Sequence, residues 1–299
     1  MSRPRFPPRD GVPASRLQLP PGPWTTVLGA LVARFPQVDE WTWRDRIARG
    51  RVLGEDGAPV TADTPARVGA EIGYYREVLD ERPIAARETI LHIDDHLVVA
   101  DKPHGLPVAP TGAFVTQTLL TRLAVTLGNP ALVPLHRIDR ETAGLVLFSA
   151  NPATRGSYQA LFRQSRIDKR YEAVAPPLTD ARFPLLRRSR IERGLPFFRM
   201  HEVDGAPNSE TRIDVLERGD VHWRYALSPV SGRKHQLRVH LAALGAPILH
   251  DPWYPVLRDA DDASRPPLQL LARALAFEDP LDGRGRVFRS ALELESALG

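Results

Sequence analysis

Residues 135–151 read LHRIDRETAGLVLFSAN, a charged loop that leads into an apolar run. The run 144–149 has the composition and length of a buried strand. Asp139 lies just before it, between Arg137 and Arg140. Because nearby positive charge favours the ionised form of a carboxyl group, Asp139 is expected to be a carboxylate and a competent nucleophile, while both arginines could hold phosphates. Taken alone, the pattern is also typical of a surface turn in which Asp139 pairs with Arg140.

A second polar segment, SPVSGRKHQLRVHLAALGAPILHDPWY, occupies residues 228–254. Gly232 marks a strand-to-helix turn, and the helix that follows favours anions at its N-terminus. The segment therefore predicts phosphate binding by Arg233, Lys234, His235 and Gln236. Arg238 is suited to pair with a buried carboxylate. A solvated basic helix is the alternative, and the five-residue spacing of His235 and His240, with no acid between them, argues against a metal site.

Two strands carry the remaining candidates. In DKRYEAVAPP, residues 168–177, Tyr171 lies behind two basic residues, and its ring either fills the core or stacks on a base. In LLARALAFEDPL, residues 270–281, the pattern indicates a buried strand that ends at a turn. Leu270 begins that strand and, taken alone, is structural.

Together these segments resemble the RluA-type family of pseudouridine synthases. HRIDRETAGL at 136–145 matches the family pattern around its catalytic aspartate, and 232–248 matches its G-R-x-H-Q-[LI]-R-V-H-x-x-x-x-G-x-P-I pattern. KRYEA at 169–173 and DKPHGLPV at 101–108 are similar to two further family segments. The resemblance covers about residues 88–280 in the family's order, and its two long motifs are individually specific.

The resemblance implies a role for each matching residue. Asp139 corresponds to the family's nucleophile, and Arg238 to the basic residue that pairs with it. Tyr171 corresponds to the tyrosine that stacks on the target base, and Arg137 to the arginine proposed to fill the gap left by a flipped nucleotide. Leu270 aligns with the apolar residue packed under the site.

The activity that the resemblance implies is isomerisation of uridine to pseudouridine in structured RNA, with no metal and no organic cofactor. Asp139 would add covalently or remove a ribose proton. One departure is visible, since Leu271 stands where the family often has histidine. Two other functions stay open: an RNA-binding module without activity, and a glycoside or nucleoside hydrolase that uses Asp139 with Glu141 as a carboxylate pair.

The sequence predicts an α+β fold, with a mixed, largely antiparallel sheet and flanking helices, plus a small N-terminal α/β module. Residues 1–22 are expected to be an extended arm, 23–75 an RNA-binding module that resembles an S4 domain, 76–88 a linker and 89–299 the catalytic domain. The S4 resemblance rests on residues 47–72 and lacks the usual leading Arg-Leu-Asp segment.

Composition limits the class of protein and its partners. The 299 residues carry a net charge of +4 and no cysteine, which fits a reducing cytoplasm and excludes disulfides. No apolar run is long enough for a membrane helix, and no secretory signal is evident. An arginine-rich stretch at 182–199 favours contact with a polyanion. The expected partner is ribosomal RNA of the large subunit or tRNA, and the expected state is a monomer.

Overall fold

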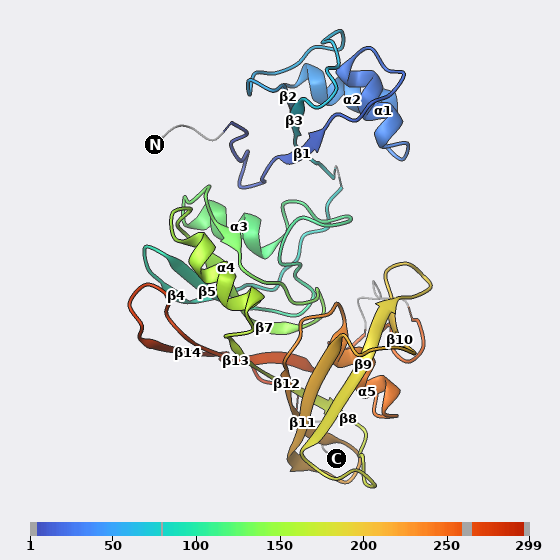
Figure 1. Ribbon diagram of the computed structural model, residues 1–299, viewed down its shortest axis with the longest axis vertical. Helices are drawn as coiled ribbons and strands as arrows, with labels where there is room; N and C mark the ends of the chain where they lie inside the picture. The colour runs from blue at the N-terminus through green and yellow to red at the C-terminus, as the bar shows by residue number, and fades with distance from the viewer. Residues whose placement is uncertain (1–4, 79, 259–264, 296–299) are drawn as a thin grey trace. The chain divides into compact units, whose positions relative to one another are not determined.

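The computed structural model describes residues 5–78, 80–258 and 265–295, which form two compact units (Figure 1). The first unit runs to Arg82 and includes Pro110–Pro130, and the second holds Pro83–Ala109 and the chain from Ala131 onward. The boundary at Arg82 lies inside the segment 76–88 that the sequence suggests as a linker. No helix in the described ranges is long and apolar enough to cross a membrane.

The first unit combines short helices with a small sheet. Its helices are α1 (Val27–Arg34), α2 (Glu40–Ala48) and α3 (Leu119–Thr126). Its strands follow the order β1-β3-β2, with bounds Ser15–Gln18, Glu71–Tyr74 and Val52–Leu53. The side chains of Thr26, Asp39 and Thr118 cap the three helices by accepting backbone N–H groups, which is why each helix begins where it does.

The expected extended arm differs from the structure. Residues 15–18 form strand β1, which pairs antiparallel with β3, and Leu19 is buried in the core of the unit. The strand alternates half-buried and exposed side chains, as expected of a strand at a sheet edge. Four residues among prolines and arginines are too few to stand out as a strand pattern.

The second unit is built on an eleven-stranded sheet. Its order is β10-β9-β11-β12-β8-β13-β7-β5-β4, with β14 paired to β13 and β6 to β7. The only parallel pair in the described sheet is β7 with β13. The expected mixed, largely antiparallel α+β fold is therefore confirmed. The strand bounds are β4 Thr89–Ile93, β5 Leu97–Lys102, β6 Val133–Pro134, β7 Ala143–Ser149, β8 Asp168–Ala175, β9 Leu185–Arg193, β10 Met200–Val203, β11 Ser209–Arg218, β12 Trp223–Pro229, β13 Leu270–Glu278 and β14 Gly285–Arg289.

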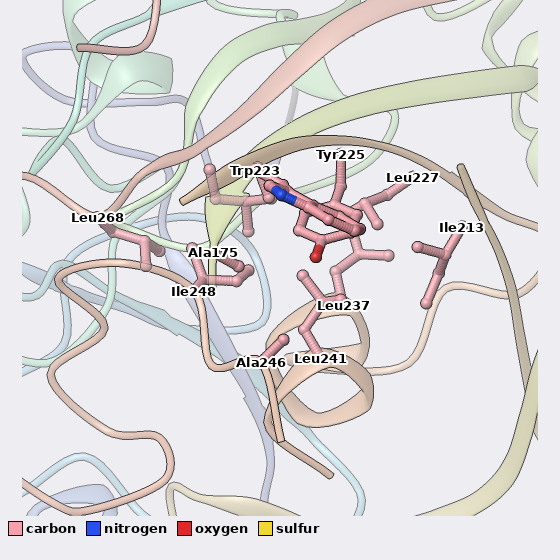
Figure 2. Packing of buried hydrophobic residues seen from close by; sticks show 12 residues of the cluster. Ala175, Ile213, Trp223, Tyr225, Leu227, Leu237, Leu241, Ala246, Ile248 and Leu268 are labelled. Atoms are coloured by element: carbon pink, nitrogen blue, oxygen red, sulfur yellow. The ribbon is translucent and has the colours of Figure 1, made fainter. Parts of the chain in front are cut away.

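Helix α5 (Gln236–Ala243) is fixed on this sheet by an apolar cluster (Figure 2). Leu237 and Leu241 from the helix pack among Ile213, Tyr225 and Leu227 from the strands. Leu241 and all three strand residues are fully buried. Burying one such side chain contributes roughly 1.5–3 kcal/mol, so the cluster is strong enough to fix the helix in place. The same helix carries Arg238, which is also buried.

Gly144 sets the close approach of β7 to β13. It has a φ of +106°, and an added Cβ would lie 2.3 Å from the carbonyl oxygen of Ala272. A methyl group cannot fit at that distance from backbone, so only glycine allows the parallel pairing of Ala272 with Gly144. This pairing places the loop before β7 beside the strand that adjoins β8.

Candidate active site

Asp139 lies in the turn that leads into β7, and Arg238 reaches it from α5. The NH1 group of Arg238 donates to Oδ2 of Asp139 at 3.1 Å. The side chain of Asp139 is 24% exposed, whereas that of Arg238 is 1% exposed. The carboxylate therefore meets solvent on one side and a buried guanidinium on the other, as the sequence predicts for this pair.

A second carboxylate, Asp251, fixes the guanidinium. Its two oxygens accept from Nε and NH2 of Arg238, each at 2.7 Å. Asp251 also accepts from the backbone N–H groups of Trp253 and Tyr254. The guanidinium carbon lies 4.9 Å from the ring centroid of Trp253 and 5.2 Å from that of Tyr254. This bidentate pair leaves NH1 to face Asp139.

These contacts set the charge of the site. Burial acts to raise the pKa of Asp139, but the positive charges of His235, when protonated, and of Arg238 lower it below its usual value. Burial also acts to lower the pKa of Arg238, and its bonds to Asp251 and Asp139 outweigh this effect and raise it. At neutral pH the site thus contains an ionised Asp139 beside a permanent cation.

His235 faces the other oxygen of Asp139. Its Nε2 lies 3.8 Å from Oδ1, and its Nδ1 lies 2.8 Å from the hydroxyl of Tyr254. Because the backbone N–H of Met200 already donates to that hydroxyl, we assign the hydroxyl proton to Nδ1, which leaves the imidazole proton on Nε2. Burial lowers the pKa of His235 to about 4, although Asp139 acts to raise it. The ring is therefore neutral at pH 7.

Tyr171 and Leu270 lie on neighbouring strands of the sheet. Leu270 on β13 is 3% exposed and pairs in register with Ala173 on β8, two residues beyond Tyr171. Tyr171 is half-buried and packs against the cluster that contains Leu270. Burial, and then the charge of Asp139, raise the pKa of the Tyr171 hydroxyl, so the phenol stays protonated. The ring is thus placed near the nucleophile in a form suited to stacking.

The loop that carries Asp139 is held by side chains of the segment DKPHG, residues 101–105. The ammonium group of Lys102 is fully buried and donates to the backbone oxygens of Pro103 and Arg140, both at 2.9 Å. The ring Nδ1 of His104 donates to the backbone oxygen of Glu141 at 2.6 Å. Burial lowers the pKa of Lys102 to about 7. The conformation of the turn after Asp139 therefore depends on two side chains that lie more than thirty residues earlier.

Three further cations belong to this neighbourhood: Arg137 and Lys234 interact electrostatically with Asp139, and Arg193 interacts with Lys234. All three are exposed. Burial lowers the pKa of Lys234, Asp139 raises it, and Arg137, Arg193 and Arg238 lower it further, so these groups share one electrostatic neighbourhood. No acidic side chain in the described ranges lies within ion-pair distance of these three.

The remaining predicted phosphate ligands have other contacts. Nε of Arg233 donates to the backbone oxygen of Asn208 at 3.0 Å, and its side chain stays exposed. Nε of Arg140 donates to Glu141 at 2.8 Å. Because Glu141 is paired in this way, it does not form an opposing carboxylate for Asp139. The second carboxylate on Arg238 is buried, so the described residues lack the pair that the hydrolase alternative requires.

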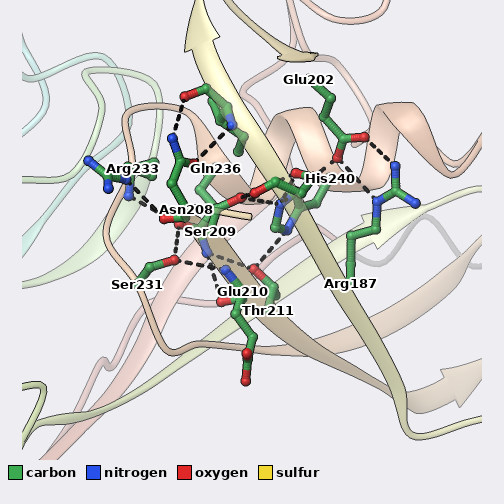
Figure 3. A network of polar contacts seen from close by, with 12 residues as sticks. Arg187, Glu202, Asn208, Ser209, Glu210, Thr211, Ser231, Arg233, Gln236 and His240 are labelled. Carbon is green, nitrogen blue, oxygen red and sulfur yellow. Dashed lines mark hydrogen bonds and ion pairs between the residues drawn. The ribbon is translucent and has the colours of Figure 1, made fainter. Parts of the chain in front are cut away.

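Gln236 is a structural residue rather than an exposed ligand (Figure 3). Its Oε1 accepts from Ser231 at 2.7 Å and from the backbone of Arg233 at 3.1 Å. Its Nε2 donates to Glu210 O at 2.9 Å and to Thr211 Oγ1 at 2.8 Å. With all four amide positions used inside the protein, the side chain fixes the turn before α5.

His240, one turn further along α5, belongs to the same polar network (Figure 3). Its Nε2 lies 3.0 Å from the hydroxyls of Ser189 and Ser209, and its Nδ1 lies 2.9 Å from Thr211 Oγ1. The side chain is fully buried, and burial lowers its pKa to about 4. The network attaches α5 to β9 and β11 without adding charge.

Comparisons with known proteins agree with this geometry. The family model described as RNA pseudouridylate synthase matches residues 96–243, from β5 to the end of α5. An uncharacterised RNA pseudouridine synthase of Synechocystis is 30% identical over 225 residues, covering 74% of this chain and 76% of that protein. The dual-specificity RNA pseudouridine synthase RluA of Pasteurella multocida is 33% identical, covering 64% of this chain and 87% of that protein. The chain belongs to the RluA-type family of RNA pseudouridine synthases.

Solved structures place the synthase in the same fold. Human RNA pseudouridylate synthase domain containing 1 superposes with a TM-score of 0.56 at 25% identity, covering 70% of this chain and 85% of that one. Its domain-containing 4 counterpart superposes with a TM-score of 0.54 at 28% identity, covering 69% and 88% of the two chains. The chain is thus an RNA pseudouridine synthase, an isomerase that converts uridine in RNA to pseudouridine.

Sequence reasoning missed three residues that build the synthase's site. Asp251, Trp253 and Tyr254 hold Arg238 in place, yet these last residues of the segment 228–254 were given no role. An acid close to two aromatics, in the sequence HDPWY, is the signal that could have indicated them. Leu271, the position where the family often has histidine, is fully buried in an apolar cluster.

The arginine-rich stretch 182–199 also differs from expectation. Four of its arginines lie on β9, and three of these each contact a glutamate: Arg187 with Glu202, Arg188 with Glu210 and Arg190 with Glu192. The acids come partly from neighbouring strands, which is why the sequence alone shows an excess of positive charge. In the described part of the chain, no cluster of three or more histidines and acids is placed to hold a metal ion.

Proposed function

We propose that this synthase isomerises a uridine in structured ribosomal RNA or tRNA, with Asp139 as nucleophile, Arg238 as its charge partner and Tyr171 stacking on the target base. The proposal further assigns the RNA backbone to Arg137, Lys234 and Arg233. The proposal rests on the 3.1 Å contact between the partly exposed carboxylate of Asp139 and the buried guanidinium of Arg238. Asp251 fixes that guanidinium by a bidentate contact.

The geometry suits the steps of the reaction. A flipped uridine would stack on Tyr171, with its ribose near Oδ1 of Asp139. The bond between N1 and C1′ breaks and the bond between C5 and C1′ forms, while the hydrogen on C5 passes to water and N1 gains one. Atoms balance without any added group. Arg238 keeps the carboxylate ionised before the reaction.

The RNA class is inferred from the activities after which relatives are named. One is the dual-specificity RluA of Pasteurella multocida, and another is the ribosomal large subunit pseudouridine synthase D of Pseudomonas aeruginosa, 29% identical over 74% of this chain and 70% of that protein. We further propose that the enzyme is a cytoplasmic monomer, and that residues 23–75 are an S4-like RNA-binding module. The catalytic domain of the enzyme would extend over residues 89–299, and residues 76–88 would be the linker between the module and this domain.

Tritium release from RNA labelled with 5-tritiated uridine tests the proposal. Asp139→Asn should lower the rate by roughly 10⁴-fold, since it removes the nucleophile, while RNA binding is retained. Asp204→Asn is the matched control, because Asp204 is an exposed acid in a loop of the same unit and should leave the rate unchanged. An Asp139→Asn protein that keeps more than a few per cent of the rate would disprove the assignment. Release of uracil into solution would indicate hydrolysis instead.

A further inference from the structure

The hairpin between β9 and β10 exposes two large apolar side chains. Leu195 is 91% exposed and Phe197 is 72% exposed, the two highest fractions among the large hydrophobic residues of this hairpin. Residues 194–199 form its tip, which is closed by the bond from Gly194 N–H to the carbonyl of Arg199 at 2.9 Å. The tip is thus an ordered turn with its apolar groups in solvent, an arrangement that calls for a ligand.

Three contacts connect the tip to the active site. The ring of Phe198 lies 5.1 Å from that of Trp253, the residue that covers the guanidinium of Arg238. Nζ of Lys234 donates to the carbonyl of Phe198 at 2.9 Å. NH2 of Arg199 donates to the carbonyl of Pro255 at 2.9 Å. One aromatic layer therefore separates the tip from the charge partner of Asp139.

Charge at the base of the tip favours an anionic partner. Arg193 enters the tip from β9, and Lys234 touches it from the turn before α5. Within the described ranges no acid forms an ion pair with either cation. Exposed apolar and aromatic groups flanked by cations suit unpaired nucleotides, because every base offers a π-face and every linkage a phosphate.

We infer that the 194–199 tip is a stacking surface for the unpaired nucleotides that flank the target uridine, with Leu195 and Phe197 against bases and Arg193 and Lys234 against their phosphates. The inference rests on the proposed function. The tip would stack on the nucleotides beside the flipped uridine, a role that the residues around Asp139 do not have. A flipped uridine leaves neighbours that have lost a stacking partner, and the tip offers them a new one beside the site.

The test compares Leu195→Ala/Phe197→Ala with Leu216→Ala/Val221→Ala in the full chain. The control pair is 54% and 57% exposed at the β11–β12 end of the same sheet, so both variants remove exposed apolar groups. The substrate is bulk RNA labelled with 5-tritiated uridine, from a strain that lacks this gene. The tip variant should raise KM about tenfold or more, with kcat within twofold of the parent, and the control should change neither. Leu195→Ala/Phe197→Trp should recover most of the loss.

Three outcomes would overturn the inference, and they differ from one another. If the parent enzyme is active and the tip variant matches the control, the tip does not bind substrate. If the tip variant changes the sedimentation coefficient of the enzyme and leaves kcat/KM unchanged, the surface binds a second copy of the chain. If the parent itself releases no tritium, the proposed function fails, and this inference fails with it.

Discussion

Two groups of cations in the second unit have opposite surroundings. The paired β9 arginines, Arg187, Arg188 and Arg190, each contact a glutamate. The site cations, Arg137, Arg193 and Lys234, form no ion pair with an acid among the described residues. The sequence does not separate the two groups, since Arg193 belongs to the same arginine-rich stretch as the paired arginines.

The difference shows that neighbours on other strands decide how positive charge is used. On β9, acids from β10 and β11 neutralise Arg187 and Arg188, and the pairs help to align the strands. Among the described residues, the carboxylates within ion-pair distance of Arg238 are those of the nucleophile and of the buried Asp251. Positive charge that remains there is available to RNA phosphates.

Arg238→Gln should have the largest effect, because it removes the one cation that serves both folding and chemistry. Two carboxylates would lose their partner, one of them fully buried. We expect tritium release to fall by roughly 10³-fold or more, and the free energy of unfolding, from urea titration, to fall by about 3–5 kcal/mol. Arg212→Gln, at an exposed position on β11, is the control and should change neither. Unaltered stability in Arg238→Gln would mean that Asp251 is compensated by something else.

Acid titration should sharpen the comparison, because each group of cations has one buried neutral histidine. His235 faces Asp139, Arg238 and Lys234, and His240 faces Glu202 and Arg187. Folding lowers both pKa values to about 4, below the ordinary value of about 6.5, so the unfolded chain takes up protons first. Stability is then complete above pH 6.5 and is lost as the pH falls toward 4.

We expect each of the two histidines to lower the free energy of unfolding by about 2 kcal/mol between pH 7 and pH 5, or about 4 kcal/mol together. Urea titrations at several pH values measure this slope. His201→Gln, at an exposed histidine on β10, should leave the slope unchanged, whereas His240→Gln should reduce it. A stability that stays flat to pH 5 would contradict the assignment of neutral, buried rings.

The smallest effects are expected from double substitutions that remove either two site cations or two paired β9 arginines. Arg137→Gln combined with Lys234→Gln should weaken RNA binding by roughly tenfold and lower the salt dependence of log K by about 2, without loss of stability. Arg188→Gln combined with Arg190→Gln should leave RNA binding unchanged and alter stability by less than about 1 kcal/mol, because both pairs are exposed. Filter binding over a salt series measures both. Equal losses of affinity would show that the β9 arginines also contact RNA.

The sequence predicted the strongly patterned parts of the fold. Strand β7 and helix α5 lie where the apolar run at 144–149 and the turn at Gly232 place them, to within a few residues. Strand β9 was missed because LLRRSRIER carries few apolar residues, and its burial comes from long-range pairing with β11. Local pattern cannot report a partner that lies twenty residues away.

The active site, like the fold, was predicted from the sequence only in part. Asp139, Arg238 and Tyr171 were indicated by motifs, and the structure brings them into one neighbourhood. Asp251 was not indicated, because its importance depends on a bidentate contact with α5 that no spacing rule contains. Gln236 was expected to bind phosphate, but its amide is used by the network within the protein.

Gly144 has no Cβ, and the spacing between the strands that carry the active-site residues depends on this absence. The nucleophile precedes β7, the stacking ring lies on β8, and β13 runs between these strands. Any side chain at 144 would push β13 away from β7 and would move Tyr171 relative to Asp139. The distance between Asp139 and the ring of Tyr171 is thus set by a backbone contact. Attempts to enlarge the pocket for other bases should therefore begin at β13 rather than at the catalytic side chains.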